Sequence, residues 1–101
     1  MANKHFRSRE LLDWSYDFWC MLEIPGVCQG GPGEPAHSNQ SIHGKGGGIK
    51  AHDCFYVPAC RACHRALDHG KDMDREEKAA LWNRAYGRFL PLLIAKVMGE
   101  K

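Results

Sequence analysis

The features of a membrane-bound or exported protein are missing from this chain of 101 residues. It has no apolar run near the roughly 20 residues that a membrane-spanning helix needs. Its first residues, 1–5, do not resemble a signal peptide. We therefore expect a cytoplasmic protein with no membrane partner. Internal repeats are also absent, and no low-complexity segment appears beyond the glycine-rich loop within residues 41–50, so the length predicts a single domain over residues 1–101.

The chain also lacks a strong excess of either charge. Its formal net charge of +2 does not by itself indicate a nucleic-acid-binding protein. The distribution is more informative, because residues 44–65 contain several basic side chains and a single acid, Asp53. This stretch fits either a basic patch that contacts phosphates or an ordinary solvated surface. The basic residues in question are Lys45, Lys50, Arg61 and Arg65.

Five cysteines are present in a chain whose hydrophobic core is of marginal size. Disulfides are uncommon in a reducing cytoplasm, so a C-x-x-C pair there favours a metal site over a cystine. Cys60 and Cys63 form such a pair, and both thiolates can face one Zn²⁺ at about 2.3 Å. Cys20 and Cys28 lie on either side of a bend. We expect all four to complete a closed, structural zinc site.

An alternative remains for the first pair of cysteines. The spacing of Cys20 and Cys28 is wider than the two to four residues of a typical zinc knuckle. If these two cysteines belonged to the core, His52 would be the nearest replacement ligand. Cys54 is left over in either case, and we expect it to be a small buried hydrophobic residue.

A helix is predicted to follow Cys63, because the next residues are good helix formers. On that helix His64 and Asp68 lie one turn apart on the same face. An imidazole and a carboxylate so placed can bind a divalent cation. His69 is expected at the end of the helix, which Gly70 closes.

The remaining elements are predicted from local patterns. A short helix should begin near Ser8, which is a suitable N-cap, and a strand should follow over residues 18–22. Residues 55–57 are a second β-prone run, ending at Pro58. A C-terminal helix is expected over about 74–98, with an Asp74–Glu77 capping box. Pro91 should kink or split it near Leu90. Its apolar stripe is expected to comprise Ala80, Leu81, Ala85, Phe89 and Leu92.

The motif Cys60-Arg61-Ala62-Cys63-His64 resembles the HNH (His-Me finger) endonuclease superfamily. Zinc-bearing members of that superfamily read C-x-x-C, then H, then N, then C-x-x-C-H, and here Cys20, Cys28 and His37 precede the motif. More narrowly, residues 8–85 resemble small prophage-encoded nucleases of the YbcO-like type. The segments that carry this resemblance are Ile24–Cys28, Ala36-His37, Gly48–Lys50, Asp53, Ala59-Cys60 and Cys63-His64 through Asp68.

The resemblance implies an α+β fold, namely a small zinc-stabilised ββα-metal (His-Me finger) domain with flanking N- and C-terminal helices. Its finger core would span about 18–70. The implied activity is metal-dependent hydrolysis of DNA phosphodiester bonds, on double-stranded or branched DNA. The implied cofactors are a structural Zn²⁺ and a catalytic divalent cation, Mg²⁺ or another.

The resemblance also assigns roles to individual residues. His37 would be the general base, while His64 and Asp68 would hold the catalytic cation. Asn39 would have a supporting catalytic role. The charge distribution, rather than the resemblance, suggests the nucleic-acid contacts, which would come from Lys45, Lys50, Arg61 and Arg65.

Two alternatives stay open at this point. His43 and His52 compete with His37 as the base, and Ala36 stands where the superfamily often has an acid. The alternative function is a non-catalytic zinc module that binds nucleic acid or a protein partner. The His64–Asp68 pair favours the nuclease, because a binding module does not need such a pair.

Overall fold

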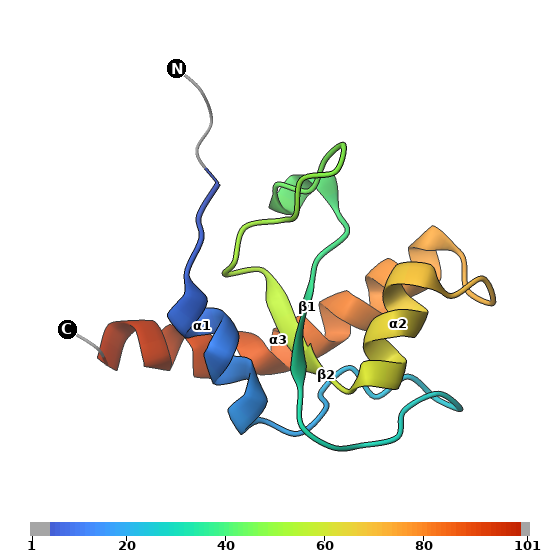
Figure 1. Cartoon of the computed structure of the whole chain (residues 1–101), viewed down its shortest axis with the longest axis horizontal. Coiled ribbons are helices and arrows are strands. Elements are labelled where there is room, and N and C mark those ends of the chain that lie inside the picture. The colour runs from blue at the N-terminus through green and yellow to red at the C-terminus, as the bar shows by residue number, and fades with distance from the viewer. Residues whose placement is uncertain (1–4, 100–101) are drawn as a thin grey trace.

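The computed structural model describes residues 5–99, which form an α+β fold, as expected. α1 (Arg9–Trp14) leads into a one-turn 3-10 helix, η1 (Ser15–Asp17). Two short strands follow, β1 (Glu34–His37) and β2 (Tyr56–Ala59), with a second 3-10 turn, η2 (Ser41–His43), in their connection. α2 (Arg61–His69) and α3 (Arg75–Gly99) complete the order (Figure 1). No helix within residues 5–99 is both long enough and apolar enough to cross a membrane.

The two strands form an antiparallel sheet in which Glu34 lies opposite Ala59 and His37 lies opposite Tyr56. The strand expected to end at Pro58 instead extends to Ala59, so Pro58 lies inside β2. A two-stranded sheet has only edge strands, where a proline is tolerated. Just before β1, a Cβ atom on Gly33 would overlap the Cβ atom of Pro58. The close approach of the two chain segments therefore requires glycine at this position.

α1 begins where the sequence predicts, because Ser8 accepts the Leu11 N–H at 3.2 Å and caps the helix. The strand expected over residues 18–22 does not form. Trp19 makes only an isolated bridge to Pro32. The Cys20 N–H donates to the Gly31 carbonyl, whereas the Met21 N–H donates to the Pro58 carbonyl of a different segment. Cys20 and Leu22 are buried, but the run forms no ladder, so the prediction of a strand was wrong.

α3 starts with the predicted capping box. Asp74 accepts the Glu77 N–H at 2.8 Å, and Glu77 accepts the Asp74 N–H at 3.0 Å. The helix is continuous through Pro91, so the expected split is absent. Pro91 and Gly87 are both exposed, so water can satisfy the Gly87 carbonyl that the proline leaves unpaired. Packing of Phe89 and Leu93 on either side of Pro91 holds the helix together.

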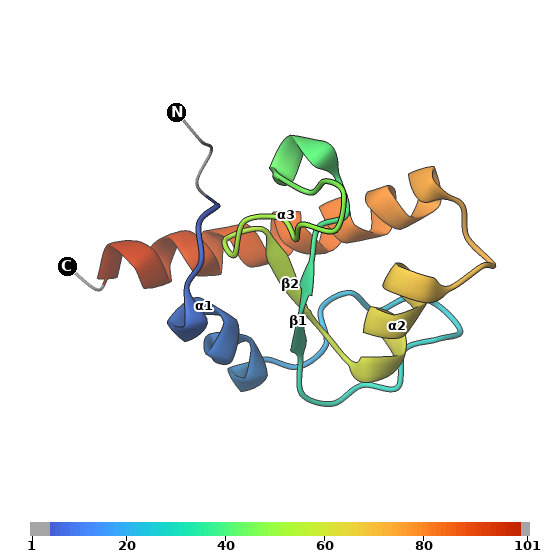
Figure 2. The same cartoon turned by 45° about the horizontal axis from the view of Figure 1, so that its top comes forward.

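The buried stripe of α3 differs in phase from the predicted one. Ala80 and Leu92 are exposed, whereas Trp82 and Leu93 are buried together with the expected Ala85 and Phe89. Turning the molecule shows α3 running along its full length beside the sheet, with α1 near one end and α2 near the other (Figure 2). Its first half packs in the cluster that contains the cysteines, and its second half packs against α1 and β2.

Candidate functional site

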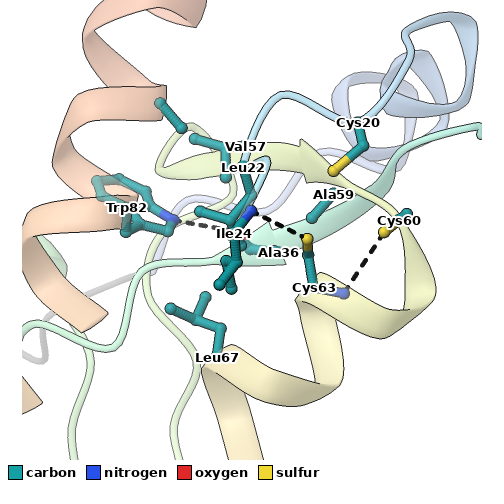
Figure 3. Close-up of a cluster of buried hydrophobic side chains, with 11 residues drawn as sticks. Cys20, Leu22, Ile24, Ala36, Val57, Ala59, Cys60, Cys63, Leu67 and Trp82 are labelled. Atoms are coloured by element: carbon teal, nitrogen blue, oxygen red, sulfur yellow. Dashed lines mark hydrogen bonds between the residues drawn. The ribbon is translucent and has the colours of Figure 1, made fainter. Parts of the chain in front are cut away.

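Four cysteines converge on one point at the beginning of α2. The Sγ atoms of Cys20, Cys28, Cys60 and Cys63 all lie within 4.8 Å of one another. Three of these cysteines are buried and Cys28 is exposed. Figure 3 shows the Cys20, Cys60 and Cys63 sulfurs pointing into a shared space beside Ala59. In a tetrahedral site with metal–sulfur bonds of about 2.3 Å, sulfurs lie about 3.8 Å apart. The four cysteines could therefore hold one metal ion such as zinc.

Backbone N–H groups surround the sulfurs and favour their thiolate forms. Cys63 receives the Ile24 N–H at 3.4 Å, and Cys28 receives the Gly30 N–H at the same distance. Burial acts to raise the pKa of the Cys60 thiol, but backbone hydrogen bonds from Cys63 and Gln29 bring it down to about 7. Burial raises the pKa of Cys63 and of Cys28. A bound metal ion would displace these protons, because the thiolate is the ligand form.

The alternative ligands lie elsewhere. Cys54 is half-buried and lies outside the four-cysteine group. The ring of His52 accepts the Phe6 N–H at 2.8 Å through Nδ1 and stacks on His5. Within residues 5–99, the four cysteines are the one group of three or more potential metal ligands that converges.

A groove of about 300 Å³, lined by none of the four cysteines, lies between β1, α2 and the glycine-rich loop. It brings together all four residues that the sequence assigns to catalysis, together with two of the four basic residues assigned to nucleic acid. Arg61 and Arg65 do not line it. Arg61 instead donates to Glu34 at 3.2 Å, and Arg65 is exposed on α2. The groove is lined by Leu12, Pro35, His37, Ser38, Asn39, Lys45, Lys50, His64 and Asp68.

His64 stands between two carboxylates in this groove. Its Nε2 atom lies 3.3 Å from Asp68 Oδ2, one helical turn away, and its Nδ1 atom lies 3.0 Å from Glu34 Oε1 on β1. Asn39 donates to the other oxygen of Asp68 at 3.0 Å. The hydrogen bond to Asp68 raises the pKa of His64, with a further contribution from Glu34 against the opposing effect of burial. The hydrogen bond from His64 lowers the pKa of Glu34.

His37 is the last residue of β1, and its side chain is only 14% exposed. Its Nε2 atom lies 2.8 Å from Oδ1 of Asp53, a buried carboxylate. Burial lowers the pKa of His37, and the hydrogen bond to Asp53 opposes that shift. The imidazole is thus held mainly neutral at the wall of the groove, a state in which it can accept a proton.

The competing histidines have other partners. The His43 ring stacks on Phe55 with centroids 4.4 Å apart, and its Nδ1 atom lies 2.6 Å from the Ser38 hydroxyl. It also packs against Trp82, and burial lowers its pKa. His69 ends α2, as the sequence predicts. His52 contacts the N-terminal segment and His43 packs in the core. Of the three candidate bases, His37 is the one that lines the groove beside His64.

Two acidic residues at this site escaped the sequence-based prediction. Glu34 and Asp53 each contact one of the groove histidines. Two signals for Asp53 were available: it is one of the residues that carry the resemblance, and it is the single acid in residues 44–65. For Glu34 the sequence contains no signal beyond its position three residues before His37. Its contact with His64 depends on how β1 lies against α2.

Comparison with known proteins identifies a family but no activity. Residues 3–99 match the family described as "Protein of unknown function (DUF968)". The chain belongs to this family. No curated protein and no solved structure matches it. The description of the DUF968 family names no reaction.

Proposed function

We propose that this DUF968 protein is a metal-dependent endonuclease that hydrolyses DNA phosphodiester bonds. One observation carries the proposal: a single groove presents a histidine base, an imidazole–carboxylate pair and two lysines. His37 can take a proton from water, which is the role of a general base. Lys45 and Lys50 can attract the phosphates of a DNA strand.

The order of the elements supports the ββα-metal interpretation. His37 ends β1, β2 pairs antiparallel with β1, and α2 follows β2 directly with His64 and Asp68 on one face. This is the arrangement that the resemblance to the His-Me finger superfamily implies. The four-cysteine group at the start of α2 would hold the structural zinc, in a reducing compartment where these thiols stay free.

The residues of the groove also fit a catalytic divalent cation. The Nε2 atom of His64 and the Oδ2 atom of Asp68 are 3.3 Å apart, so one ion could contact both. Glu34 holds the opposite ring nitrogen, which is the common carboxylate–histidine–metal arrangement. When bound, such an ion supplies charge that offsets the negative charge of the phosphate group. Asn39 orients Asp68 through its hydrogen bond.

The decisive experiment is nicking of supercoiled plasmid by the zinc-loaded protein with Mg²⁺, Mn²⁺ or Ni²⁺. We expect the parental protein to nick, and His37→Ala to be slower by about 10²–10⁴-fold, the usual contribution of a general base. His69→Ala is the matched control, because it removes a histidine outside the groove lining and should cut at the parental rate. A pure parental protein that cuts with none of these ions would refute the nuclease proposal.

A non-catalytic zinc module remains the second candidate. It is favoured by the fact that the ring nitrogens of His64 already face two carboxylates within the protein. The nuclease and a zinc module that binds nucleic acid both predict that Lys45→Ala and Lys50→Ala weaken DNA binding about equally for all sequences, whereas a module that binds a protein partner does not. Each change should lower the slope of log K against log salt by about 1. Lys71→Ala, outside the groove lining, should leave the slope unchanged. The nicking assay separates the nuclease from a zinc module that binds nucleic acid.

A further inference from the structure

We infer that Asp53 is the positioning residue of His37, and that the N-terminal segment, residues 6–8, holds Asp53 in place. The inference rests on the proposed function to the extent that His37 is taken as the base. It adds a residue and a chain segment that neither the resemblance nor the family description assigns to the site.

The carboxylate of Asp53 has a defined partner for each oxygen, and its side chain is only 3% exposed. Oδ1 lies 2.8 Å from His37 Nε2, and Oδ2 accepts the Ser8 N–H at 2.7 Å. The Arg7 guanidinium lies 3.6 Å from Oδ1. A buried carboxylate with this many donors stays ionised, and the hydrogen bonds from His37 and Ser8 outweigh burial and lower the pKa of Asp53.

Hydrogen bonds join the N-terminal segment, residues 6–8, to residues 50–53. The Asp53 N–H donates to the Phe6 carbonyl at 2.9 Å. Arg7 donates to the carbonyls of Ala51 at 2.8 Å and of Lys50 at 3.0 Å. The N–H of Ser8 reaches Asp53, while the hydroxyl of the same residue caps α1. The start of α1, Asp53 and His37 therefore form one continuous hydrogen-bonded unit, and the segment would help to fix the geometry of the base.

This unit selects one tautomer of His37. An ionised carboxylate only accepts hydrogen bonds, so Nε2 must carry the proton that faces Asp53. Nδ1 then keeps its lone pair, and within residues 5–99 the ring makes no other hydrogen bond. In the proposed reaction a water proton passes to Nδ1 while the water oxygen bonds to phosphorus. The bond to the leaving oxygen breaks, and that oxygen takes a proton from solvent. Asp53 stabilises the imidazolium that results.

Other charged groups also face His37. Lys50 and Arg7 act to lower its pKa, and Asp53 is the acid in direct contact with it. The ring of Tyr56 lies across the sheet with its centroid 6.5 Å away. Lys45, His64 and Asp68 share the groove. Because Asp53 favours the protonated ring, removing its charge should lower the pKa of His37 further.

The first test measures the tautomer in the zinc-loaded parental protein. Two-bond ¹H–¹⁵N NMR correlations of the histidine rings distinguish a proton on Nε2 from one on Nδ1, and His37→Gln identifies the signals of His37. We expect the Nε2–H form. This test needs no cleavage activity and no variant of Asp53, so it remains decisive even if such variants do not fold. A ring protonated on Nδ1 alone would overturn the inference.

The second test follows plasmid nicking by Asp53→Asn as a function of pH. We expect kcat to fall by about 10²–10⁴-fold, as when the orienting carboxylate of a catalytic triad is lost, with KM little changed. The acidic limb of the profile should move to lower pH, because the base acts only when neutral and its pKa has fallen. Asp13→Asn, an exposed acid on α1, is the control and should match the parental protein.

The outcomes separate this inference from the proposed function. If Asp53 were merely structural, Asp53→Asn would lose activity in proportion to its unfolded fraction and keep the parental acidic limb, which would overturn the inference. Arg7→Gln should give a smaller loss than Asp53→Asn, and a parental rate in both variants would also overturn it. If the parental protein is inactive with every ion, His37 has no role as a base and the proposed function fails. If the protein is active but His37 carries its proton on Nδ1, only the role of Asp53 is refuted.

Discussion

At the scale of the residue, the groove contains two histidines with opposite surroundings. His64 lies between Glu34 and Asp68, which raise its pKa, whereas burial lowers the pKa of His37 despite Asp53. The surroundings of His64 therefore favour its charged form and those of His37 its neutral form, and a cation that binds His64 would have to displace the proton from its ring. Two predictions follow from this contrast.

On the proposed function, replacing His64 or Asp68 by alanine should weaken the binding of a divalent cation in the groove, so part of the cleavage defect should recover at high Mg²⁺ or Mn²⁺. His37→Ala should not recover, because a fuller metal site does not replace a missing proton acceptor. The measurement is the nicking rate against cation concentration for the three variants. Equal recovery in all three would contradict the separate roles.

On the proposed function, Glu34→Gln should lower the affinity of the groove for a divalent cation by about 10–100-fold, the usual effect of changing the partner of a metal-binding histidine. Calorimetric titration of the zinc-loaded protein with Mn²⁺ measures it directly. Glu23→Gln is the matched control, because Glu23 forms an exposed ion pair with Arg88. Unchanged affinity in Glu34→Gln would show that the carboxylate does not act through His64.

At the scale of the element, the sequence predicts whatever is decided locally. The Ser8 cap, the Asp74–Glu77 capping box and the i, i+4 pair of His64 and Asp68 all depend on neighbours within one turn, and all three are observed. The prediction of a strand over residues 18–22 was wrong, because a ladder needs a partner strand that the sequence does not identify.

The same distinction applies to the site. The C-x-x-C spacing predicts the approach of Cys60 and Cys63, while the convergence of Cys20 and Cys28 upon them is a tertiary event that the pattern merely permitted. Glu34 and Asp53 could not be predicted, since their contacts cross from one element to another. The stripe of α3 was displaced for a related reason: the surfaces it packs against decide which face is buried.

Trp82 connects α3 to β1, the strand that ends at His37. Its indole N–H donates to the Ala36 carbonyl at 3.0 Å, and the residue is 1% exposed (Figure 3). Trp82→Phe should lower the free energy of unfolding by about 1–3 kcal/mol, because the buried carbonyl loses its donor. Urea titration measures this effect. Trp19→Phe, at a residue that is 68% exposed, should change stability far less.

At the scale of the whole molecule, the cysteine cluster ties three separate parts of the chain together: the segment after η1, the bend before β1 and the start of α2. A closed four-cysteine zinc site contributes directly to folding. For a chain of 101 residues, whose core is small, that contribution should decide whether the fold is stable.

We therefore expect one tightly bound zinc per chain by elemental analysis, and loss of the folded circular dichroism signal after chelation. Cys60→Ser should unfold the domain, because it removes a buried ligand. Cys54→Ser, outside the cluster, should keep both its zinc and its fold. A folded protein purified without zinc would refute the structural role of the cluster.

The chain leaves the cysteine cluster at Cys28 and returns to it at Cys60, and the residues between them include His37, both groove lysines and Asp53. On the proposed function, a newly made chain without its metal has no assembled groove, and synthesis alone does not endanger the DNA of the cell that makes it. The supply of zinc, rather than the rate of translation, would then set the moment at which cutting begins.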